Sequence, residues 1–380
     1  MKSVGNSTIC IVHGSDLSIP NGATDRVIAF INGLMNAGYD VHLVIPKPKG
    51  PLPCDVEGVN IHTINSTENG VTNQITRATE LSFKAKKITN NAHALLQIEH
   101  STLAGFASLM GCSDYILDMH DLCYTDPLYL NLPFSGRVQR CIYKIEERAV
   151  KKASKILVVS EPMKNFIIGE WDLPEGKVEV IPSGFFSSKI SDDISQNVVD
   201  STVISRVGSL FAHLDVDAIV ALAKSLQETG IKLHLVGGGV AEDELKIKIK
   251  RHNLENVMIS GWVPQDEALR IMQRSLLTFE SIKDTMTTRL ASPIKILNYA
   301  ALGKPIVLSD VSELSEIFKK KDAALVSDPS DVDQFIENVH LLLNNPNLRN
   351  RLGNNALSLV HDYSWEKQGE KLVRAIENMD

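Results

Sequence analysis

Residues Ser292–Ser309 read SPIKILNYAALGKPIVLS, a stretch that predicts a helix followed at once by a buried strand. We expect Ser292 to cap this helix and Pro293 to take its first position, where the missing N–H costs nothing. A glycine then ends the helix before the apolar strand. Lys295 and Asn298 share one helix face near the N-terminus, whose N–H groups attract anions. The stretch indicates either a phosphate-binding helix or an ordinary helix with a solvated lysine.

The composition is that of a globular chain with room for two domains. Of the 380 residues 43% are hydrophobic and 22% charged, and the chain is long for a single core. The net charge of −7 argues against nucleic acid as the main partner. No run of about 18 apolar residues and no apolar signal segment occur, so we expect a cytoplasmic protein without a transmembrane helix.

The cysteines indicate neither a disulfide framework nor a metal site. Five of them are scattered along the chain: Cys10, Cys54, Cys112, Cys123 and Cys141. No pair has the Cys-x-x-Cys spacing, so we expect reduced, mostly buried thiols and no bound metal. Two Asp-x-Asp sequences, at 215–217 and 331–333, stand at expected helix starts, where carboxylates complement the helix dipole. They are interpreted as structural.

Short apolar runs alternate with amphipathic segments, which predicts parallel sheets with right-handed crossovers. The strands expected in the first half are 8–13, 39–45, 59–64, 94–99, 115–119, 156–160 and 178–182. After a polar linker, those expected in the second half are 202–207, 232–236, 257–260, 276–280, 305–308 and 323–326. We therefore predict an α/β fold with two Rossmann-like doubly wound parallel-sheet domains that face a cleft. The expected parts are domains 1–186 and 202–362, a linker 187–201, and a terminal helix in 363–380 that packs back towards the first domain.

Functional side chains in such sheets gather at the carboxyl ends of the strands. Two places fit this rule: residues 97–100, QIEH, and residues 117–121, LDMHD. Gly22, in a loop before an expected helix, either lets a ligand approach backbone N–H groups or is a turn residue. No G-x-G-x-x-G follows the first strand and no P-loop sequence occurs, which disfavours a nucleotide-dependent dehydrogenase and a P-loop NTPase.

Several stretches, in the right order, resemble the GT-B glycosyltransferases, specifically the large family 4 of retaining enzymes. In the first half these are PNG, GYDVH, LDMHDL, ERAVKKASKILVVSE and VIPSG, within 20–22, 38–42, 117–122, 147–161 and 180–184. In the second half they are LVGGG, ISGWVP, the stretch quoted above and YSW, within 235–239, 259–264, 292–309 and 363–365. The likeness spans nearly the whole chain. It implies a GT-B fold that binds the donor mainly in the second domain and the acceptor mainly in the first.

Some positions depart from the family pattern. The loop that commonly carries an Arg and a Lys for the donor pyrophosphate is GSLFAHLD, with Ser209 and Leu214 at those positions. Asn298 stands where a glutamate often holds the donor ribose or base, and Leu290 replaces a second glutamate. Charge for the pyrophosphate must then come from helix N-termini or from other cations: Lys295, Arg289 or Arg206. A catalytically reduced GT-B subunit, acting as a non-enzymatic partner or scaffold, stays open as the alternative.

The resemblance implies a retaining, metal-independent transfer of a sugar from a nucleotide sugar, UDP- or GDP-linked, to a glycan, lipid-linked or small-molecule acceptor. No cofactor is implied beyond this co-substrate. A helix N-terminus and a cation would stabilise the charge on the leaving pyrophosphate. The donor-binding residues implied or indicated are Gly22, Gly208, Ser209, Gly237, Ser292, Pro293, Lys295 and Asn298.

His120 matches a position where family members place a histidine near the transferred sugar. It would orient a hydroxyl or the acceptor, and the alternative is a histidine satisfied within its domain. Asp121 is expected to hold a loop or the histidine ring and completes the predicted catalytic pair. Glu99 and His100 are weaker candidates for acceptor contacts.

Basic side chains gather on the expected helix after residue 75, at Lys84, Lys86 and Lys87, and in a second run at 319–321. Membrane-associated family members use basic surfaces of the first domain to reach lipid-linked acceptors. A peripheral contact with the inner membrane face is therefore one interpretation, and an ordinary solvated charged face is the other.

Overall fold

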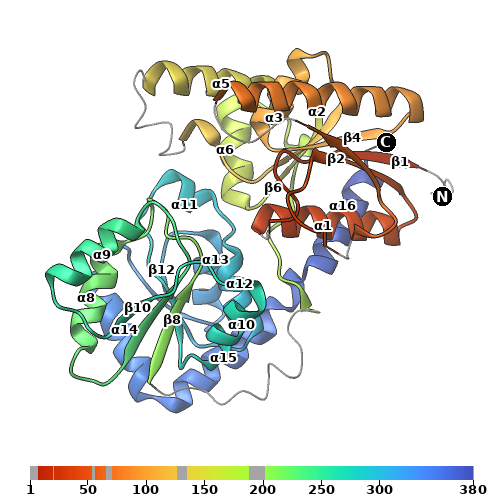
Figure 1. The fold of residues 1–380 in the computed structure, drawn as a ribbon. Helices are drawn as coiled ribbons and strands as arrows, with labels where there is room; N and C mark the ends of the chain where they lie inside the picture. The colour runs from red at the N-terminus through yellow and green to blue at the C-terminus, as the bar shows by residue number, and fades with distance from the viewer. Residues whose placement is uncertain are drawn as a thin grey trace. The chain divides into compact units, whose positions relative to one another are not determined.

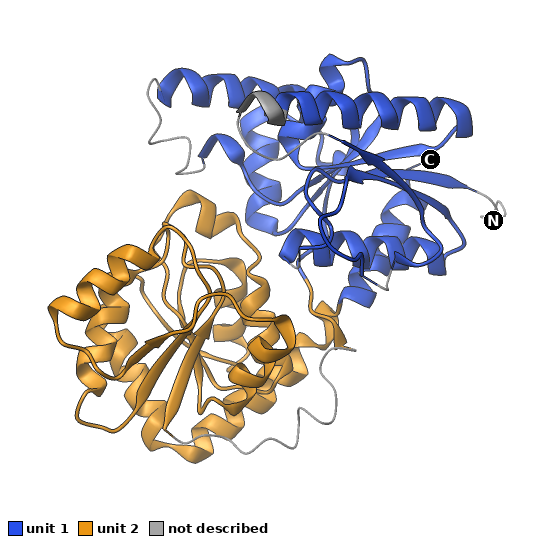
Figure 2. Cartoon of the chain, viewed as in Figure 1, with its two compact units in different colours: residues 1–183, 365–380 blue, residues 184–364 orange. Residues whose placement is uncertain are grey.

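The computed structural model describes residues 7–19, 21–53, 56–65, 71–125, 135–187 and 202–379. It divides into two compact units, residues 1–183 with 365–380, and residues 184–364 (Figure 2). Three parts of the sequence discussed above lie outside the described residues: 188–201 of the expected linker, Pro20 of the PNG stretch, and Cys54. Each unit is built on one parallel sheet.

The sheet of the first unit has seven strands in the order β3-β2-β1-β4-β5-β6-β7. Their bounds are β1 Thr8–Val12, β2 Asp40–Pro46, β3 Asn60–Ile64, β4 Leu95–Glu99, β5 Tyr115–Met119, β6 Ala153–Val158 and β7 Val178–Val180. All neighbours pair in parallel. The order reverses between β1 and β4, and the crevice at such a point is where open α/β sheets bind ligands.

Helices cover both faces of this sheet: α1 and α16 lie on one side, and α2, α3 and α5 on the other (Figure 1). Their bounds are α1 Gly22–Asn36, α2 Val71–Ala92, α3 Ser101–Leu109, α5 Ser135–Lys152, α6 Glu161–Trp171 and α16 Trp365–Glu377, with short 3₁₀ turns η2 Cys123–Thr125 and η3 Glu175–Lys177. Helices α1 and α16 meet where Gly33 faces Gly369. Because neither residue has a Cβ, the two backbones can approach closely.

The sheet of the second unit has six strands in the order β10-β9-β8-β11-β12-β13, again all parallel. Their bounds are β8 Val203–Val207, β9 Lys232–Val236, β10 Val257–Ile259, β11 Thr278–Glu280, β12 Ile306–Ser309 and β13 Leu325–Ser327. The helices are α8 Val216–Leu226, α9 Glu242–Arg251, α10 Gln265–Arg274, α11 Met286–Leu290, α12 Ile294–Ala301, α13 Glu313–Lys320, α14 Val332–Asn344 and α15 Pro346–Val360, with the turn η5 His361–Tyr363.

Two buried apolar clusters fill the second unit. One joins β8 and β9 to α8, α9 and α14, through side chains such as Leu235, Leu245 and Phe335. The other joins β12 to α10, α12 and α13, through side chains such as Leu297 and Phe318. Because helices cover both faces of the sheet, the side chains on both sides of each strand are buried, and the strands are therefore mainly apolar. The predicted α/β class, with two Rossmann-like doubly wound parallel-sheet domains, is confirmed.

The two Asp-x-Asp sequences begin helices, as the sequence predicted. Asp215 caps α8 by accepting a hydrogen bond from the amide of Ala218 over 3.0 Å. Asp331 caps α14 by accepting one from the amide of Gln334 over 2.9 Å. Asp217 forms an ion pair with a lysine of α9. These carboxylates stabilise helix starts.

Helix α12 begins later than the sequence predicted. Pro293 stands at the N-cap, with φ −74° and ψ 109°, and Ile294 is the first helical residue, so the expectation that Ser292 caps the helix is wrong. A proline disfavours the helical conformation in the residue before it, which here is Ser292. Pro293 itself is also extended, so the helix begins one residue after it. Gly303 ends the helix as expected, with a positive φ of 62°. In the described parts of the chain, no helix combines the length and apolarity needed to cross a membrane.

Candidate functional site

Three charged side chains converge at the carboxyl ends of β8 and β11. Arg206, on β8, donates from Nη2 to Oε1 of Glu280 over 2.9 Å. Lys295, in the first turn of α12, donates from Nζ to the same oxygen over 3.2 Å. Arg206 and Glu280 are buried, whereas the Lys295 side chain is 20% exposed. Lys295 is therefore the solvent-accessible cation of the three.

Burial and the neighbouring charges shift the pKa values of these groups. Burial raises the pKa of Glu280, but Arg206 and Lys295 outweigh it and leave that pKa lowered. Burial, followed by repulsion from Arg206, lowers the pKa of Lys295 to about 8, although Glu280 acts in the opposite direction. Lys295 thus keeps its positive charge near neutral pH and loses it as the pH rises through about 8.

The same arginine holds the glycine turn that follows β8. Arg206 donates from Nη1 to the Gly208 carbonyl over 2.9 Å and from Nη2 to the Ser209 carbonyl over 3.0 Å. A Cβ on Gly208 would lie 3.0 Å from Cε of Lys295, and one on Gly237 would lie 2.2 Å from the Gly208 carbonyl oxygen. The structure thus brings together Gly208, Ser209, Gly237 and Lys295, four of the predicted donor-binding residues.

Tyr299 fixes α12 against β8. Its hydroxyl donates to the carbonyl of Val207 over 3.0 Å and accepts from the amide of the same residue over 2.8 Å. Ser292 and Pro293 precede the first turn of α12, and the partly exposed Asn298 lies one turn further along. Among the described residues, none hydrogen-bonds to the Asn298 side chain. The start of α12 therefore places a helix N-terminus and a side-chain amide near the lysine.

The sequence did not single out Glu280 or Tyr299. Glu280 ends the fully buried strand β11, and it is itself nearly completely buried. A carboxylate in a buried strand requires a buried cation as its partner, so the sequence of this strand already indicated a buried ion pair. Tyr299 lies on the buried face of α12, where its hydroxyl needs a partner.

In the first unit, a buried ion pair orients His120. Arg26, on α1, donates to Asp118 from Nε over 2.8 Å and from Nη2 over 2.9 Å. Its Nη1 also donates to the carbonyl of Ile181 over 2.8 Å. Oδ2 of Asp118, in turn, lies 2.9 Å from Nε2 of His120. The imidazole is therefore held by a carboxylate whose own position is fixed by a bidentate arginine.

These charges favour the protonated form of the histidine. Burial lowers the pKa of His120, but the Asp118 carboxylate and its hydrogen bond raise it by more, so the net shift is upward. Burial raises the pKa of Asp118, but Arg26 and His120 outweigh burial and hold that pKa far below its usual range. The His120 side chain is 19% exposed, so part of it is accessible to solvent.

The structure corrects the expected partner of His120. The sequence suggested Asp121, but the ring is held by Asp118, because residues two apart on an extended segment project to the same side. Asp121 projects elsewhere, and its Oδ1 lies 3.4 Å from Nε2 of His100. Asp118 and Arg26 were missed, although a carboxylate inside an apolar strand and an arginine in an apolar helix segment were both visible in the sequence.

Glu99 is not presented to solvent as an acceptor contact would require. It ends β4 with 2% of its surface exposed, and its Oε2 lies 2.7 Å from Nδ1 of His13, at the end of β1. This pair stands at the point where the strand order reverses. Oε1 of Glu99 and Nε2 of His13 have no hydrogen-bond partner among the described residues. His100, the neighbour of Glu99, is 40% exposed.

Gly22 belongs to a helix start rather than to an open loop. It is the first residue of α1, and Asn21 is the N-cap. Oδ1 of Asn21 accepts hydrogen bonds from the amides of Ala23 and Thr24, each over 3.0 Å. These two amides are therefore already occupied.

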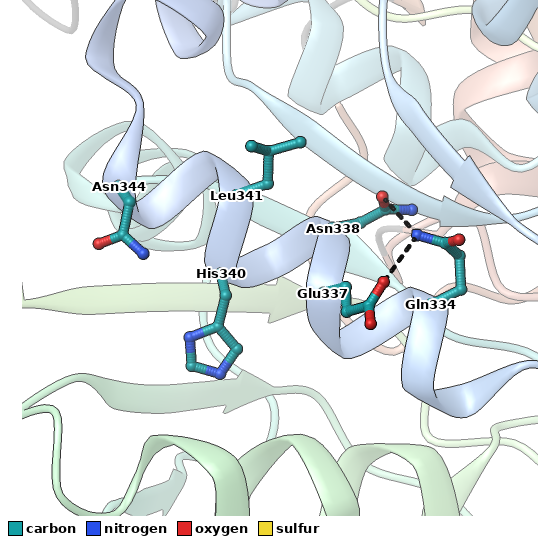
Figure 3. A pocket seen from close by; sticks show the side chains of 6 residues that line it. All are labelled: Gln334, Glu337, Asn338, His340, Leu341 and Asn344. Atoms are coloured by element: carbon teal, nitrogen blue, oxygen red, sulfur yellow. Dashed lines mark hydrogen bonds between the residues drawn. The ribbon is translucent and has the colours of Figure 1, made fainter.

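A surface hollow of about 420 Å³ follows one side of α14 (Figure 3). It is lined by Gln334, Glu337, Asn338, His340, Leu341 and Asn344. Nε2 of Gln334 donates two long hydrogen bonds, to Oε2 of Glu337 over 3.5 Å and to Oδ1 of Asn338 over 3.4 Å (Figure 3). None of the predicted site residues lines the hollow, so we assign it no role in the site.

Two family models match consecutive parts of the chain. Residues 20–186 match the family Glycosyltransferase Family 4, and residues 188–358 match the family Glycosyl transferases group 1. An uncharacterized glycosyltransferase of Methanocaldococcus jannaschii is 24% identical over 250 residues. That match spans 62% of this chain and 62% of the archaeal protein.

Solved structures share the fold over nearly the whole chain. Sucrose-phosphate synthase from Thermosynechococcus elongatus superposes with a TM-score of 0.81 at 16% identity, and the match covers 98% of this chain and 99% of that one. HepE of Anabaena, solved in complex with UDP and glucose, gives a TM-score of 0.74 at 15% identity, with 97% and 99% covered. The chain therefore carries the two domains of the GT-B glycosyltransferases, a family 4-like domain followed by a group 1 domain.

Proposed function

We propose that this chain transfers a sugar from a nucleotide-sugar donor to an acceptor hydroxyl, with retention of the anomeric configuration and without a metal ion. The observation that carries the proposal is the convergence of Lys295, the glycine turn at Gly208 and the start of α12 in the group 1 domain. A cation beside a helix N-terminus stabilises the charge that develops on a leaving diphosphate. The charge that the missing Arg and Lys would supply thus comes from another element.

The donor diphosphate would lie against the turn of Gly208, Ser209 and Gly237, where the absence of side chains on both glycines lets the backbone and Lys295 pack closely together. Lys295 would contact its oxygens, with Ser292 and Pro293 at the start of α12. Asn298 would contact the ribose or the base through its amide. The UDP complex of HepE favours a UDP-linked donor over a GDP-linked one.

In the family 4-like domain, His120 would orient a hydroxyl of the transferred sugar or of the acceptor. The buried pair of Arg26 and Asp118 fixes the ring, so binding does not have to order it. Asp121 and His100 would lie at the border of the acceptor site. Glu99 is buried, so its part would be to position His13, to which it is hydrogen-bonded. The acceptor is proposed to be a glycan or a lipid-linked sugar.

Substitution of Lys295 tests the donor site. We expect Lys295→Ala to reduce sugar transfer by about 100- to 1000-fold, because one charge that stabilises the leaving diphosphate is lost. In the wild type, transfer should fall as the pH rises through about 8, since the lysine then loses its proton. Lys295→Arg should move this fall to higher pH. The measurement is release of UDP from a panel of UDP-sugars as a function of pH.

Substitution of His120 tests the acceptor side and the non-enzymatic alternative. His120→Ala should lower kcat and leave UDP binding, measured by calorimetry, unchanged. The exposed Arg251, at the end of α9, offers a control outside the site, and Arg251→Ala should leave turnover unchanged. Turnover that is equal in the wild type, Lys295→Ala and His120→Ala would contradict this site. A chain that binds UDP but shows no turnover would support the scaffold alternative.

A peripheral membrane contact is proposed for the surface of α2 and α3. Phe83 on α2 is 66% exposed and Leu109 on α3 is 59% exposed, and Lys84, Lys86 and Lys87 lie on α2 beside that phenylalanine. Apolar side chains flanked by lysines suit an anionic lipid interface. We expect Phe83→Ser to reduce sedimentation with phosphatidylglycerol vesicles. Equal sedimentation of the variant and the wild type would argue for a solvated face.

A further inference from the structure

We propose that His100, Asp121 and Cys123 bind one divalent transition-metal ion of the Zn²⁺ type, in the family 4-like domain. The three residues come from two neighbouring segments. His100 joins β4 to α3, whereas Asp121 and Cys123 follow β5 and enter the turn η2. Their ligand atoms all lie within 4.8 Å of one another. The proposal does not rest on the proposed sugar transfer.

The distances between the ligand atoms are those of a tetrahedral site. Sγ of Cys123 lies 3.3 Å from Nε2 of His100 and 3.7 Å from Oδ1 of Asp121. The remaining edge, from Nε2 of His100 to Oδ1 of Asp121, is 3.4 Å. Zinc bonds of about 2.0–2.3 Å at tetrahedral angles place such atoms about 3.3–3.6 Å apart. The three observed distances agree with this range to within about 0.1 Å, so the three atoms approximate one face of a zinc tetrahedron.

Neighbouring groups fix two of the ligands. Nδ1 of His100 lies 2.9 Å from the hydroxyl of Thr102, so this ring nitrogen can donate and leave Nε2 with its lone pair towards the other ligands. His100 also has a φ of 78°, a conformation that is strained for any residue with a side chain. Glu146, on α5, accepts from the amide of Cys123 over 3.0 Å and from that of Tyr124 over 3.1 Å, which anchors the turn.

The ligand types select the metal. A thiolate with an imidazole suits zinc and disfavours magnesium and calcium, which prefer oxygen ligands alone. The thiolate and the carboxylate together supply two negative charges, which balance a divalent ion. Cys123 is buried, but the side chains of His100 and Asp121 are 40% and 50% exposed, so an ion can enter from their side.

Three protein ligands leave one position of the tetrahedron for water, and the ion has no part in the proposed sugar transfer. The bound ion would tie the end of β4 to the segment after β5. His120 precedes Asp121 directly, so the ion would also restrain the segment that carries this histidine. Nothing in the sequence spacing indicated the site, because His100 is distant in sequence from the other two ligands.

Cobalt binding tests the proposal without any activity assay. The full chain is freed of metal with a chelator, and CoCl₂ is added while the absorption spectrum is recorded. We expect one cobalt per chain, a thiolate-to-cobalt band in the near ultraviolet and the intense visible bands of a tetrahedral ion. ZnCl₂ should abolish these bands by displacement and should raise the melting temperature of the metal-free chain.

Variants identify the ligands. Cys123→Ser should remove the thiolate band, and Asp121→Asn, at a side chain that is 50% exposed, should weaken cobalt binding by about tenfold or more. Cys141→Ser removes an exposed thiol of α5 and should change neither. The proposal is overturned if the wild type gives no tetrahedral cobalt spectrum, or if the spectrum survives both Cys123→Ser and Asp121→Asn. Loss in Cys141→Ser would place the ion elsewhere and would overturn it too.

Discussion

At the scale of single residues, the charges that matter most in this chain are buried and paired. Arg206 with Glu280, and Arg26 with Asp118, each place an arginine and a carboxylate with at most 2% exposure. Removal of one partner from such a pair leaves an uncompensated charge, which costs about 3–5 kcal/mol. Each pair also holds a more exposed group, Lys295 or His120. We therefore interpret the buried pairs as supports for the groups that would contact ligand.

Lys304 is a buried lysine that has no carboxylate partner among the described residues. It is 6% exposed, and its Nζ donates to the carbonyl of Gln273. Burial lowers its pKa from 10.5 to about 8. Between these two values the unfolded chain binds a proton that the folded chain does not, so the folded state gains stability as the pH rises. The shift corresponds to a gain on the order of 3 kcal/mol over that window.

A comparison with Lys304→Met isolates this effect. We expect the free energy of unfolding of the wild type, relative to the variant, to rise by about 2–3 kcal/mol between pH 7 and pH 10. Urea unfolding followed by circular dichroism at the two pH values measures it. Lys321→Met, at an exposed position after α13, serves as the control and should show no such change. A difference between Lys304→Met and wild type that is independent of pH would contradict the assignment.

At the scale of elements, the contact between α1 and α16 depends on two glycines. A Cβ on Gly33 would lie 2.7 Å from the Cα of Gly369, so the helices would have to separate. We expect Gly33→Ala to destabilise the chain by about 1–3 kcal/mol, the usual range for overpacking, although alanine is the better helix former. Thermal or urea unfolding measures the effect.

Gly169 provides the matched control for this prediction. It lies inside α6, and a Cβ there would meet no atom within 4 Å. Gly169→Ala should therefore stabilise the chain by about 0.5–1 kcal/mol, through helix propensity alone. If both substitutions stabilise the chain, the close approach of α1 to α16 is not present in solution.

Hydrophobic periodicity predicted most of the elements, because a parallel sheet buried on both faces requires long apolar runs at regular spacing. Helix α6 is an element that the periodicity does not single out. Ser160, which precedes Glu161 and Pro162, is nevertheless a typical N-cap residue. In the structure the Ser160 side chain accepts a hydrogen bond from the amide of Met163 over 3.2 Å. The sequence predicts too early a start for α12, because a proline is typical of the first helical position, whereas Pro293 is the N-cap. Local signals of this kind fix a boundary only to within a few residues.

Of the charged and glycine residues in the candidate site, the sequence predicts some and does not predict others. Gly208, Gly237 and Lys295 are predicted from the sequence, and the structure places them side by side, while their role in donor binding stays a prediction. Asp118 and Glu280 are not predicted, because a buried carboxylate is explained only by its partner, and Arg26 and Arg206 are distant in sequence. Spacing along the chain gives no information on such long-range pairs.

At the scale of the whole molecule, each unit has its own parallel sheet, its own reversal of strand order and its own set of charged groups at the strand ends. The first unit carries the Arg26, Asp118 and His120 chain, and the second carries the Arg206, Glu280 and Lys295 cluster. Under the proposed function, the histidine group would serve a hydroxyl and the cationic cluster a diphosphate, so the two units would bind ligands by separate chemistry.

Hydrogen exchange with and without UDP separates the two units experimentally. A nucleotide bound at Lys295 should slow exchange of the amides after β8, after β9 and at the start of α12, within 208–214, 237–241 and 292–298. UDP alone carries no sugar, so the segment around His120 should be protected much less. Lys295→Ala should remove the protection at equal UDP concentration, whereas His120→Ala should preserve it. Protection that is strongest at 118–123 would instead place the nucleotide in the family 4-like domain, and the assignment of donor and acceptor sites would be reversed.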